Sequence, residues 1–313
     1  MPGKLLSTPE VAERLGVSRQ TAHRYIQEGR IPAQRTMGGQ YRVEESALRA
    51  FLHGGDAPAG PRILALANQK GGVGKSTTAV NLAHALAARD QRVLLVDVDP
   101  QANATMHLGL NPFEARPTIY DVLHRPAEGA GLARHAIRPN LDLVPATLDL
   151  AALELELASV FERERRLKRA LQPVLADYDF ILIDCPPALG LLTLNALVAA
   201  GEILIPLQVE PFAVRGLAQL QQTIELVQSG NPALHISGVV CTMYDGRNSL
   251  SPAIADEIRA RFGALVFQTM IPRNVALSEA SGAGQAIQDY DARSRGAQAY
   301  QALAEEVLAR VQA

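Results

Sequence analysis

Ile63-Leu-Ala-Leu-Ala67 runs directly into Asn68-Gln-Lys-Gly-Gly-Val-Gly-Lys-Ser-Thr77, and a helical pattern then continues to about Ala88. A phosphate-binding loop needs this order of apolar strand, glycine-rich loop and helix. The glycines let backbone N–H groups converge on phosphate oxygens, and the helix N-terminus adds a positive dipole. Lys75 is placed to reach the β- and γ-phosphates, and Ser76 to bind Mg²⁺ through its hydroxyl. The stretch therefore predicts a nucleotide site at the end of a buried strand.

Two further apolar runs end in aspartate. In Val93-Leu-Leu-Val-Asp97-Val-Asp99, the spacing of two puts both carboxylates on the same side of an extended chain. In Phe180-Ile-Leu-Ile-Asp184, four apolar residues carry a third carboxylate to the edge of the sheet. Beside a phosphate loop, such carboxylates hold the metal shell and orient the attacking water. We therefore expect Asp97 and Asp184 to hold Mg²⁺, with Asp184 acting through water.

From Arg62 onward, short apolar runs alternate with helical patterns. Strands that alternate with helices form right-handed βαβ crossovers. The predicted fold class is therefore α/β, with a doubly wound, mainly parallel sheet over residues 62–313. Ligands bind such sheets at the carboxyl ends of the strands, where the loop and the aspartates are found. The expected strands are Ile63–Ala67, Val93–Val96, Leu141–Val144, Phe180–Ile183, Ile203–Leu207, Ile236–Cys241 and Leu265–Met270.

The chain before this domain has a different pattern. Ser7-Thr-Pro-Glu10 begins a helix, with a hydroxyl cap, a proline in the first turn and a glutamate three residues after the cap. A second helix is expected from Ser18 to about Glu28. Two short helices joined by a tight turn that contains glycine form a helix-turn-helix.

The rest of this module is expected to be a small wing. Residues 32–43 read as extended with a hairpin tip at Gly38-Gly39, and residues 44–52 as a third short helix. The module spans residues 1–53, and residues 54–61 read as a flexible linker because they contain almost nothing that can pack. The expected small core consists of Ile26, Ile31 and Leu48.

Composition excludes several classes of protein. The 313 residues are 48% apolar and 20% charged, which is ordinary for a globular chain and excludes a wholly disordered one. No apolar run approaches the roughly 18–20 residues that cross a bilayer, and residues 1–15 lack a signal-peptide pattern, so a cytoplasmic location is expected. Cys185 and Cys241 form neither a zinc pattern nor a disulfide framework, so both are expected to be buried thiols.

A net charge of −2 conceals a basic stretch in the N-terminal module. Between residues 14 and 42, six arginines stand against the single acidic residue Glu28, a balance of +5. This stretch favours DNA binding over the alternative of a helical protein-interaction module. The arginines are Arg14, Arg19, Arg24, Arg30, Arg35 and Arg42.

The loop departs from the plain G-x-x-x-x-G-K-[ST] pattern, because Gln69 stands at the first glycine position and Lys70 opens the loop. This arrangement resembles the deviant Walker A loop of the ParA/MinD family of ATPases. In that family the early lysine reaches the nucleotide of a partner subunit. The resemblance implies a deviant P-loop NTPase fold, an ATP-sandwich homodimer and catalytic roles for Lys70, Lys75 and Asp99, with Asp99 positioning water. The implied phosphate-binding residues are Lys70, Gly71, Gly72, Val73, Gly74, Lys75, Ser76 and Thr77.

Within this family, the chain is most similar to the ParA/Soj partitioning ATPases. The segments 238–247, 271–280 and 290–300 carry this narrower resemblance, in addition to the loop and aspartate motifs. It implies a weak ATPase, stimulated by a ParB-like centromere-binding partner, that uses ATP and Mg²⁺ and segregates a chromosome or plasmid. The implied adenine-site residues are Thr242, Met243, Pro272 and Asn274.

The resemblance also implies that the ATP-bound dimer binds DNA non-specifically through arginines. Two departures from the family pattern reduce that basic surface: Ala276 replaces a frequent second arginine, and Gln285 ends a stretch that often carries lysine. Each lost phosphate contact weakens binding and flattens its salt dependence. The candidate arginines are Arg215, Arg247, Arg293 and Arg295.

Residues 5–53 resemble the winged helix-turn-helix of the MerR/excisionase group. Such modules place the N-terminal residues of the second helix on base edges in the major groove. The resemblance to ParA proteins that carry such a module implies that this one binds the operator of its own partition operon and represses it. The nucleoid is the implied location. The base-reading candidates on the second helix are Arg19, Gln20, Thr21, His23 and Arg24. The candidates on the wing are Arg35, Tyr41 and Arg42.

Two alternative functions remain at this point. The first is a transcriptional repressor in which ATP acts only as a ligand switch; the intact Asp99 and Asp184 favour turnover instead. The second is a MinD-like regulator that cycles on a membrane, which requires a basic amphipathic C-terminal anchor. The segment 299–313 carries Glu305 and Glu306 against the single basic residue Arg310, so no membrane partner is expected.

Overall fold

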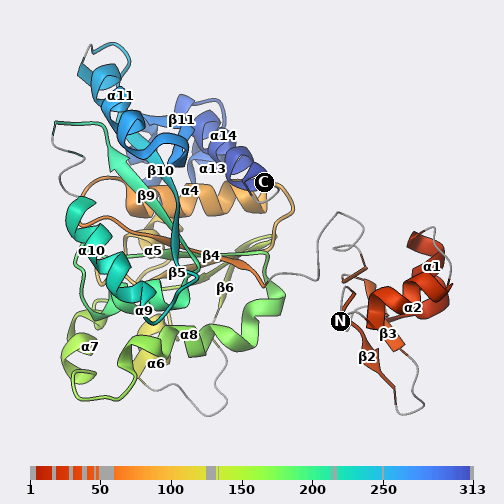
Figure 1. Cartoon of the computed structure of the whole chain (residues 1–313). Helices are drawn as coiled ribbons and strands as arrows, with labels where there is room; N and C mark the ends of the chain where they lie inside the picture. The colour runs from red at the N-terminus through yellow and green to blue at the C-terminus, as the bar shows by residue number, and fades with distance from the viewer. Residues whose placement is uncertain are drawn as a thin grey trace. The chain divides into compact units, whose positions relative to one another are not determined.

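The computed structural model describes residues 5–15, 19–27, 31–36, 41–45, 47–48, 60–124, 132, 134–211, 213, 217–248 and 250–310. The chain divides into two compact units, Met1–Pro61 and Arg62–Ala313. Each unit has its own sheet (Figure 1). The first unit has one hydrophobic core and the second has two, one on each face of its sheet.

The first unit combines short helices with a three-stranded sheet. The strand order is β1-β3-β2 and both strand pairs are antiparallel. Strand β2 pairs with β3 as a hairpin, as expected, and the Gly38-Gly39 tip lies outside the described residues. The elements are β1 (Leu5–Ser7), α1 (Thr8–Leu15), α2 (Arg19–Gln27), β2 (Gln34–Arg35) and β3 (Tyr41–Glu44).

Local chemistry explains where helix α1 begins. The backbone N–H and the hydroxyl of Ser7 both donate to the Glu10 carboxylate, at 2.7 and 2.6 Å, which confirms the predicted capping glutamate. Ile26, Ile31 and Leu48 are buried together in the core of this unit, as predicted. Of the expected third helix, Glu45 and residues 47–48 are helical and the remainder lies outside the described residues.

The second unit is built on an eight-stranded sheet in the order β11-β10-β9-β4-β8-β5-β7-β6. Its paired strands run parallel, except that β6 is antiparallel to β7 at one edge. The predicted α/β doubly wound class is confirmed. The strands are β4 (Arg62–Leu66), β5 (Val93–Asp97), β6 (His135–Arg138), β7 (Leu141–Val144), β8 (Phe180–Asp184), β9 (Glu202–Gln208), β10 (His235–Tyr244) and β11 (Val266–Pro272).

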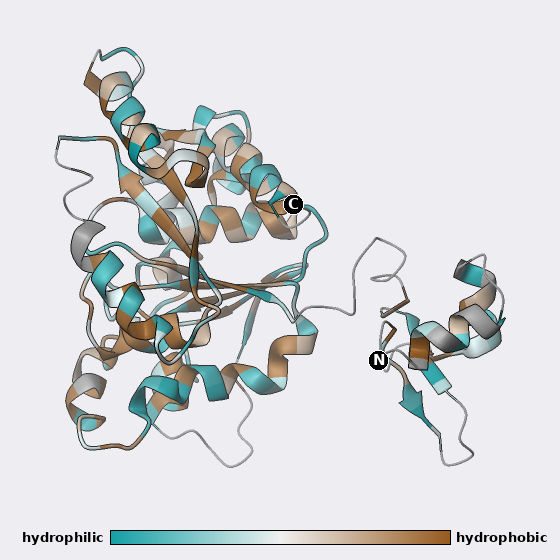
Figure 2. Cartoon of the chain, viewed as in Figure 1, coloured by the Kyte–Doolittle hydropathy of each residue, from teal (hydrophilic) through white to brown (hydrophobic). Residues whose placement is uncertain are grey.

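Helices cover both faces of this sheet, so alternate strand residues enter two separate cores. In β8, Ile181 and Ile183 pack into one core while Phe180 and Leu182 pack into the other. Figure 2 shows the apolar strands between two-toned helices. Burial on both faces explains why these strands are continuous apolar runs rather than alternating ones.

One helical layer contains α4, α5, α12, α13 and α14, and the other contains α6 to α11. None of the helices in the described ranges combines the length and apolarity that crossing a bilayer demands. The bounds are α4 (Lys75–Ala87), α5 (Asn103–His107), α6 (Ile119–His124), α7 (Leu150–Glu156), α8 (Arg166–Leu171), α9 (Leu191–Ala199), α10 (Leu217–Gln228), α11 (Leu250–Phe262), α12 (Val275–Gly282), α13 (Ile287–Tyr290) and α14 (Arg295–Ala309).

Every strand expected from the apolar runs is present, displaced at its ends by at most a few residues. Strand β6 was not expected, because its four residues lie at the sheet edge, mostly half-exposed, and do not form an apolar run. Cys185 and Cys241 are both buried free thiols, as expected.

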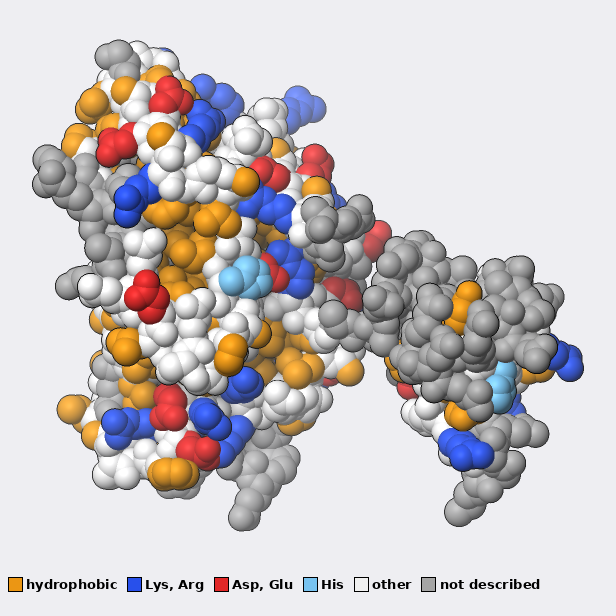
Figure 3. Space-filling view, in the orientation of Figure 1, with side chains coloured by type: hydrophobic (Ala, Val, Ile, Leu, Met, Phe, Trp, Pro, Cys, Tyr) orange, Lys and Arg blue, Asp and Glu red, His pale blue; other side chains and the backbone are white. Residues whose placement is uncertain are grey.

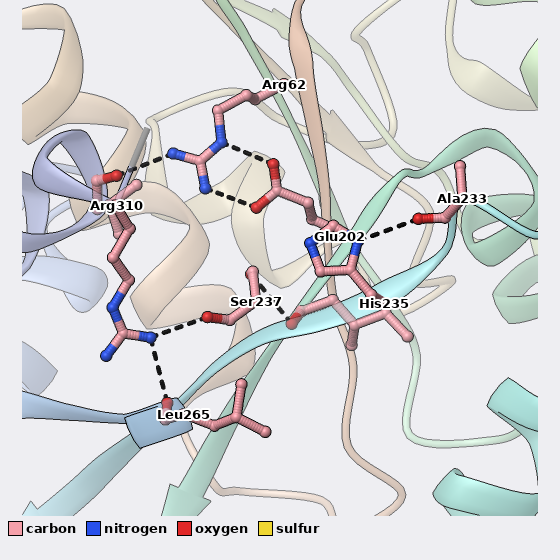
Figure 4. Close-up of polar contacts among 9 residues, drawn as sticks. Arg62, Glu202, Ala233, His235, Ser237, Leu265 and Arg310 are labelled. Carbon is pink, nitrogen blue, oxygen red and sulfur yellow. Dashed lines mark hydrogen bonds and ion pairs between the residues drawn. The ribbon is translucent and has the colours of Figure 1, made fainter. Parts of the chain in front are cut away.

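Two arginines tie the C-terminal helix to the amino ends of the central strands (Figure 4). Arg62 forms a two-bond ion pair with Glu202 of β9 and donates to the Val307 carbonyl of α14 at 2.8 Å. Arg310 lies 3.7 Å from the centre of the Phe267 ring and donates to the Ser237 carbonyl at 2.8 Å. Helix α14 is thereby held on the sheet at the end opposite the phosphate loop.

The absence of a side chain at Gly238 leaves room for the stacked side chains of Phe267 and Arg310. A Cβ at this position overlaps the Phe267 ring and lies 2.8 Å from Nη1 of Arg310. We expect Gly238→Ala to lower the free energy of unfolding by about 1–3 kcal/mol, the usual cost of overpacking a core. Urea denaturation of the full chain measures this, with Gly201→Ala as the matched control because a Cβ there meets nothing within 4 Å. Equal midpoints for the two variants contradict the prediction.

Candidate nucleotide-binding site

The glycine-rich loop connects β4 to α4 in the predicted order. Gly72 and Gly74 have φ of 75° and 87°, a left-handed conformation that favours glycine. Helix α4 begins at Lys75 and has 13 residues, so Ser76 and Thr77 lie in its first turn. The backbone N–H groups at this end have no partners within the helix and are available to an anion.

Lys75 is almost buried beneath the loop. Its Nζ donates to the carbonyl of Lys70 at 3.2 Å. Burial lowers the pKa of Lys75, and the nearby charges of Asp184 and Asp99 oppose that shift. A lysine whose ammonium group rests on a backbone carbonyl can exchange that weak acceptor for a phosphate oxygen.

Lys70 is half-exposed and forms an ion pair with Glu210. The loop around it is tied to β9, because Asn68 accepts from the Lys70 N–H at 3.0 Å and donates to the Pro206 carbonyl at 2.8 Å. Sequence reasoning assigned no role to Glu210 or Asn68. The available signal was that Glu210 follows an apolar run, at the same sheet edge as the loop.

Asp97 and Asp184 are neighbours across the β5–β8 pair, both fully buried. Asp97 accepts from the Thr105 N–H at 2.9 Å and the Thr105 hydroxyl at 2.8 Å. Burial raises the pKa of Asp97 to about 7, against the hydrogen bonds from Thr105, which lower it. Asp99, two residues later, is also buried, and its carboxylate accepts from the Gln101 N–H at 2.9 Å.

Asp184 fits a Mg²⁺ site. Among the described residues, none makes a hydrogen bond of ordinary geometry to its two buried carboxylate oxygens, although the Ser76 hydroxyl is close enough to lower its pKa. Burial, together with the charge of Asp97, raises that pKa well above its usual range. No group of three or more His, Cys, Asp or Glu side chains surrounds a metal position in the described ranges. Mg²⁺ in nucleotide sites needs no such cage, because phosphates and water supply most of its ligands.

A pocket of about 510 Å³ opens beside the loop. It is lined by Gly74 and Thr77 of the loop and by all four residues expected at the adenine site: Thr242, Met243, Pro272 and Asn274. Thr242 also donates to the Val73 carbonyl at 2.8 Å, which joins the end of β10 to the loop. Sequence reasoning missed Leu277 and Tyr300 in the pocket wall, because their helical spacing reads as ordinary core.

The arginines expected on the DNA surface of this unit have different surroundings. Arg247 is 81% exposed and binds the Asp245 carboxylate through two nitrogens, both at 2.9 Å. This contact holds the pKa of Asp245 at about 2. Arg293 and Arg295 are exposed at the start of α14, and Arg215 lies outside the described residues.

In the first unit, α2 carries all five residues expected to read bases. The side chains of Arg19 and His23 are exposed; those of Gln20, Thr21 and Arg24 are outside what the structure describes. On the wing, Tyr41 packs edge-on against the His23 ring with centroids 5.4 Å apart, and Arg35 lies 5.9 Å from the Tyr41 centroid. Arg42 is half-buried on the same strand as Tyr41. The structure thus brings His23, Tyr41 and Arg35 together.

Comparisons with known proteins agree with both units. Residues 61–236 match a family model described as an AAA domain, and residues 5–56 match one described as a helix-turn-helix domain. Cobyrinic acid a,c-diamide synthase from Mycobacterium smegmatis, solved with a bound ATP analogue and magnesium, is 38% identical with a TM-score of 0.70. That match covers 81% of this chain and 96% of the synthase.

Two curated relatives are more similar in sequence. The chromosome partitioning protein ParA of Caulobacter vibrioides is 50% identical, over 80% of this chain and 94% of the relative. The sporulation initiation inhibitor protein Soj of Bacillus subtilis is 49% identical, over 79% of this chain and 98% of the relative. The loop, the aspartates at the strand ends and the similarity to these relatives together show that the chain belongs to the ParA/Soj family of P-loop partition ATPases, and it carries a helix-turn-helix domain at its N-terminus.

Proposed function

We propose that this chain is a weak, partner-stimulated ATPase that segregates a chromosome or plasmid. ATP binding forms a homodimer that holds DNA, and hydrolysis to ADP and phosphate releases it. The observation that carries the proposal is the convergence of Lys75, Asp99 and Asp184 where β4, β5 and β8 end, beside a pocket of nucleotide size. The names of the most similar relatives support the partition role.

The residues around the loop have distinct proposed roles. Backbone N–H groups from Lys70 to Thr77 hold the phosphates, Lys75 contacts the β- and γ-phosphates, and Ser76 and Asp184 hold Mg²⁺. The metal, when bound, neutralises charge that develops on the phosphates. Thr242, Met243, Pro272 and Asn274 surround the base in the pocket; Asn274 also caps α12 through its amide oxygen, which accepts from the Ala276 N–H at 3.0 Å.

Asp99 orients the attacking water, and Lys70 of each subunit contacts the nucleotide of the other. Asp97 was expected at the metal, but three hydrogen bonds occupy most of the accepting capacity of its carboxylate. We therefore propose that its main task is to hold the polypeptide around Asp99. Lys70 has to leave Glu210 before it reaches a partner subunit, so dimer formation exchanges a surface ion pair for a phosphate contact.

Non-specific DNA binding is proposed for Arg215, Arg247, Arg293 and Arg295. The positive electrostatic field around these arginines is expected to be modest. Asp245 neutralises Arg247, and on the face shown in Figure 3 the basic side chains of the second unit are interspersed with acidic ones. DNA phosphates therefore compete with Asp245 for Arg247. We expect binding that is weak and strongly reduced by salt.

Specific DNA binding is proposed for residues 1–53, joined by the linker 54–61 to the ATPase domain of residues 62–313. In this proposal, α2 lies in the major groove, and the wing residues Arg35, Tyr41 and Arg42 contact phosphates or the minor groove. Dimerisation through the ATPase domain places two such modules on a two-fold operator and raises their effective concentration. The proposed target is the operator of its own operon, with a ParB-like partner and a location on the nucleoid.

Comparing the full chain with residues 61–313 tests both DNA activities. Promoter DNA and random DNA are titrated with ADP and with ATP, at two salt concentrations. We expect the truncation to lose promoter binding by at least about tenfold, since specific contacts typically exceed non-specific binding by that factor or more. ATP-dependent binding to random DNA survives. Arg247→Ala in the full chain is the matched variant, and it weakens only the random-DNA component.

The same experiment decides the second candidate, an ATP-switched repressor. The Asp245–Arg247 pair and the non-basic Ala276 and Gln285 favour it, because each reduces the surface that partition by random DNA binding requires. If residues 61–313 bind no random DNA with either nucleotide, partition through that surface is contradicted and the repressor is the better description.

A further inference from the structure

Thr105 occupies the centre of a buried hydrogen-bond chain behind Asp99. It lies in α5, is fully buried, and gives both its N–H and its hydroxyl to Oδ2 of Asp97. The hydroxyl oxygen in turn accepts from the Ala146 N–H at 2.9 Å, just after β7. Three separate parts of the chain therefore meet at one side chain.

The other oxygen of Asp97 extends this chain toward the water-positioning carboxylate. Asp97 Oδ1 accepts from the Asp99 N–H at 3.1 Å. The turn that follows is closed by the Ala102 N–H, which donates to the Asp99 carbonyl at 2.8 Å while Ala102 has φ of 52°. The backbone of Asp99 is thus held on both sides, and one of these sides depends on the orientation of Asp97.

We propose that Thr105 is a positioning residue for ATP hydrolysis. By fixing the Asp97 carboxylate through two bonds, it holds the Asp99 backbone where the Asp99 side chain orients water. In this role Thr105 acts through Asp97 and Asp99 and not by contact with nucleotide or water. The inference rests on the proposed function, in which Asp99 positions the attacking water. Small displacements of a positioning group are costly, and about 1 Å can reduce a rate roughly 100-fold.

A packing role makes the opposite prediction from a positioning role, and two variants separate them. Thr105→Val keeps the shape and the backbone N–H but removes the hydroxyl, which frees Oδ2 of one donor and leaves the Ala146 N–H without its acceptor. Thr105→Ser keeps the hydroxyl and removes only a methyl group. Positioning predicts that serine preserves activity and valine does not; packing predicts the reverse.

The experiment measures steady-state ATP hydrolysis by the full-length chain with random duplex DNA, well below the unfolding temperature of each variant. We expect Thr105→Val to lower kcat by about 10- to 100-fold with KM changed less than about threefold. Thr105→Ser stays within about threefold of wild type in both. A valine variant with wild-type kcat, or a serine variant as slow as the valine one, overturns the proposal. If the valine variant does not fold, the serine result alone decides.

The wild type and Asp99→Ala separate this inference from the proposed function. A wild type without turnover means that both fail. Suppose that the wild type hydrolyses ATP and Asp99→Ala does not. If Thr105→Val then hydrolyses ATP at the wild-type rate, only the inference about Thr105 fails. In single-turnover measurements, adding Thr105→Val to Asp99→Ala is expected to cause no further loss of hydrolysis rate, because both substitutions act through the Asp99 carboxylate. A further loss of the same size as in the wild-type background contradicts action through Asp99.

Discussion

Replacing Lys75 with alanine is expected to abolish both ATP-dependent dimerisation and ATP turnover, whereas replacing Lys70 abolishes only what requires a second subunit. Lys75 is buried beneath the loop with its Nζ on the Lys70 carbonyl, where we propose that it meets the phosphates of its own nucleotide. Lys70 points instead to a half-exposed position beside Glu210. We therefore expect the two lysines of one loop to serve different nucleotides.

The measurements are the affinity for a fluorescent ATP analogue and the molecular mass by light scattering with ATP. Lys75→Ala lowers turnover by at least about 100-fold, the usual effect of losing a charge that stabilises the transition state. Lys70→Ala binds the analogue within about threefold of wild type and stays monomeric, because only the partner's phosphate contact is lost. Lys168→Ala, an exposed lysine on α8, is the control and changes neither property. A Lys70→Ala chain that still dimerises contradicts the contact between subunits.

Asp99→Ala is expected to separate ATP binding from hydrolysis. The Asp99 carboxylate is buried two residues after the end of β5 and accepts a hydrogen bond from the Gln101 N–H. Its removal takes away the group that we propose orients water but leaves the loop, Lys75 and Asp184 in place. We expect kcat to fall by about 10²–10⁴-fold, the range for losing a positioned acid–base group.

ATP-dependent dimerisation and random-DNA binding persist in this variant, and the complex lives longer because hydrolysis no longer releases it. Rapid-quench kinetics and the rate of dissociation from random DNA measure the two effects. Asp256→Ala is the matched control, because Asp256 is a surface carboxylate paired with Arg259 at 3.3 Å on α11. If Asp99→Ala hydrolyses ATP at the wild-type rate, the role of Asp99 is wrong.

The strands and the phosphate loop are predictable because their chemistry is local. A strand buried on both faces must be apolar along its length, as Phe180–Asp184 and Val93–Asp97 are, and a loop with left-handed positions needs glycine at 72 and 74. Strand β6 cannot be predicted in this way, because an edge strand that remains partly exposed to solvent needs no apolar run.

The contacts of the site residues are harder to predict from the sequence, because the contacting residues come from distant parts of the chain. Asp97 looks like a metal ligand by its spacing from Asp99, yet the fold turns α5 back so that Thr105 occupies its carboxylate. Glu210 becomes the partner of Lys70 only because β9 lies next to β4 in the sheet. Neither pairing follows from spacing along the chain.

The residue order of this chain therefore specifies the class of site: a loop that binds phosphates, carboxylates at strand ends, and a helix-turn-helix in front of them. Backbone conformation and strand burial depend on residues that are neighbours in the sequence, so these features can be predicted from short segments of the chain. Which carboxylate is free and which cation is paired depends on contacts such as Thr105 with Asp97 and Asp245 with Arg247. Those contacts are set by strand order and by the path of each turn, and a hydrogen bond forms only where the folded backbone brings donor and acceptor within about 3 Å.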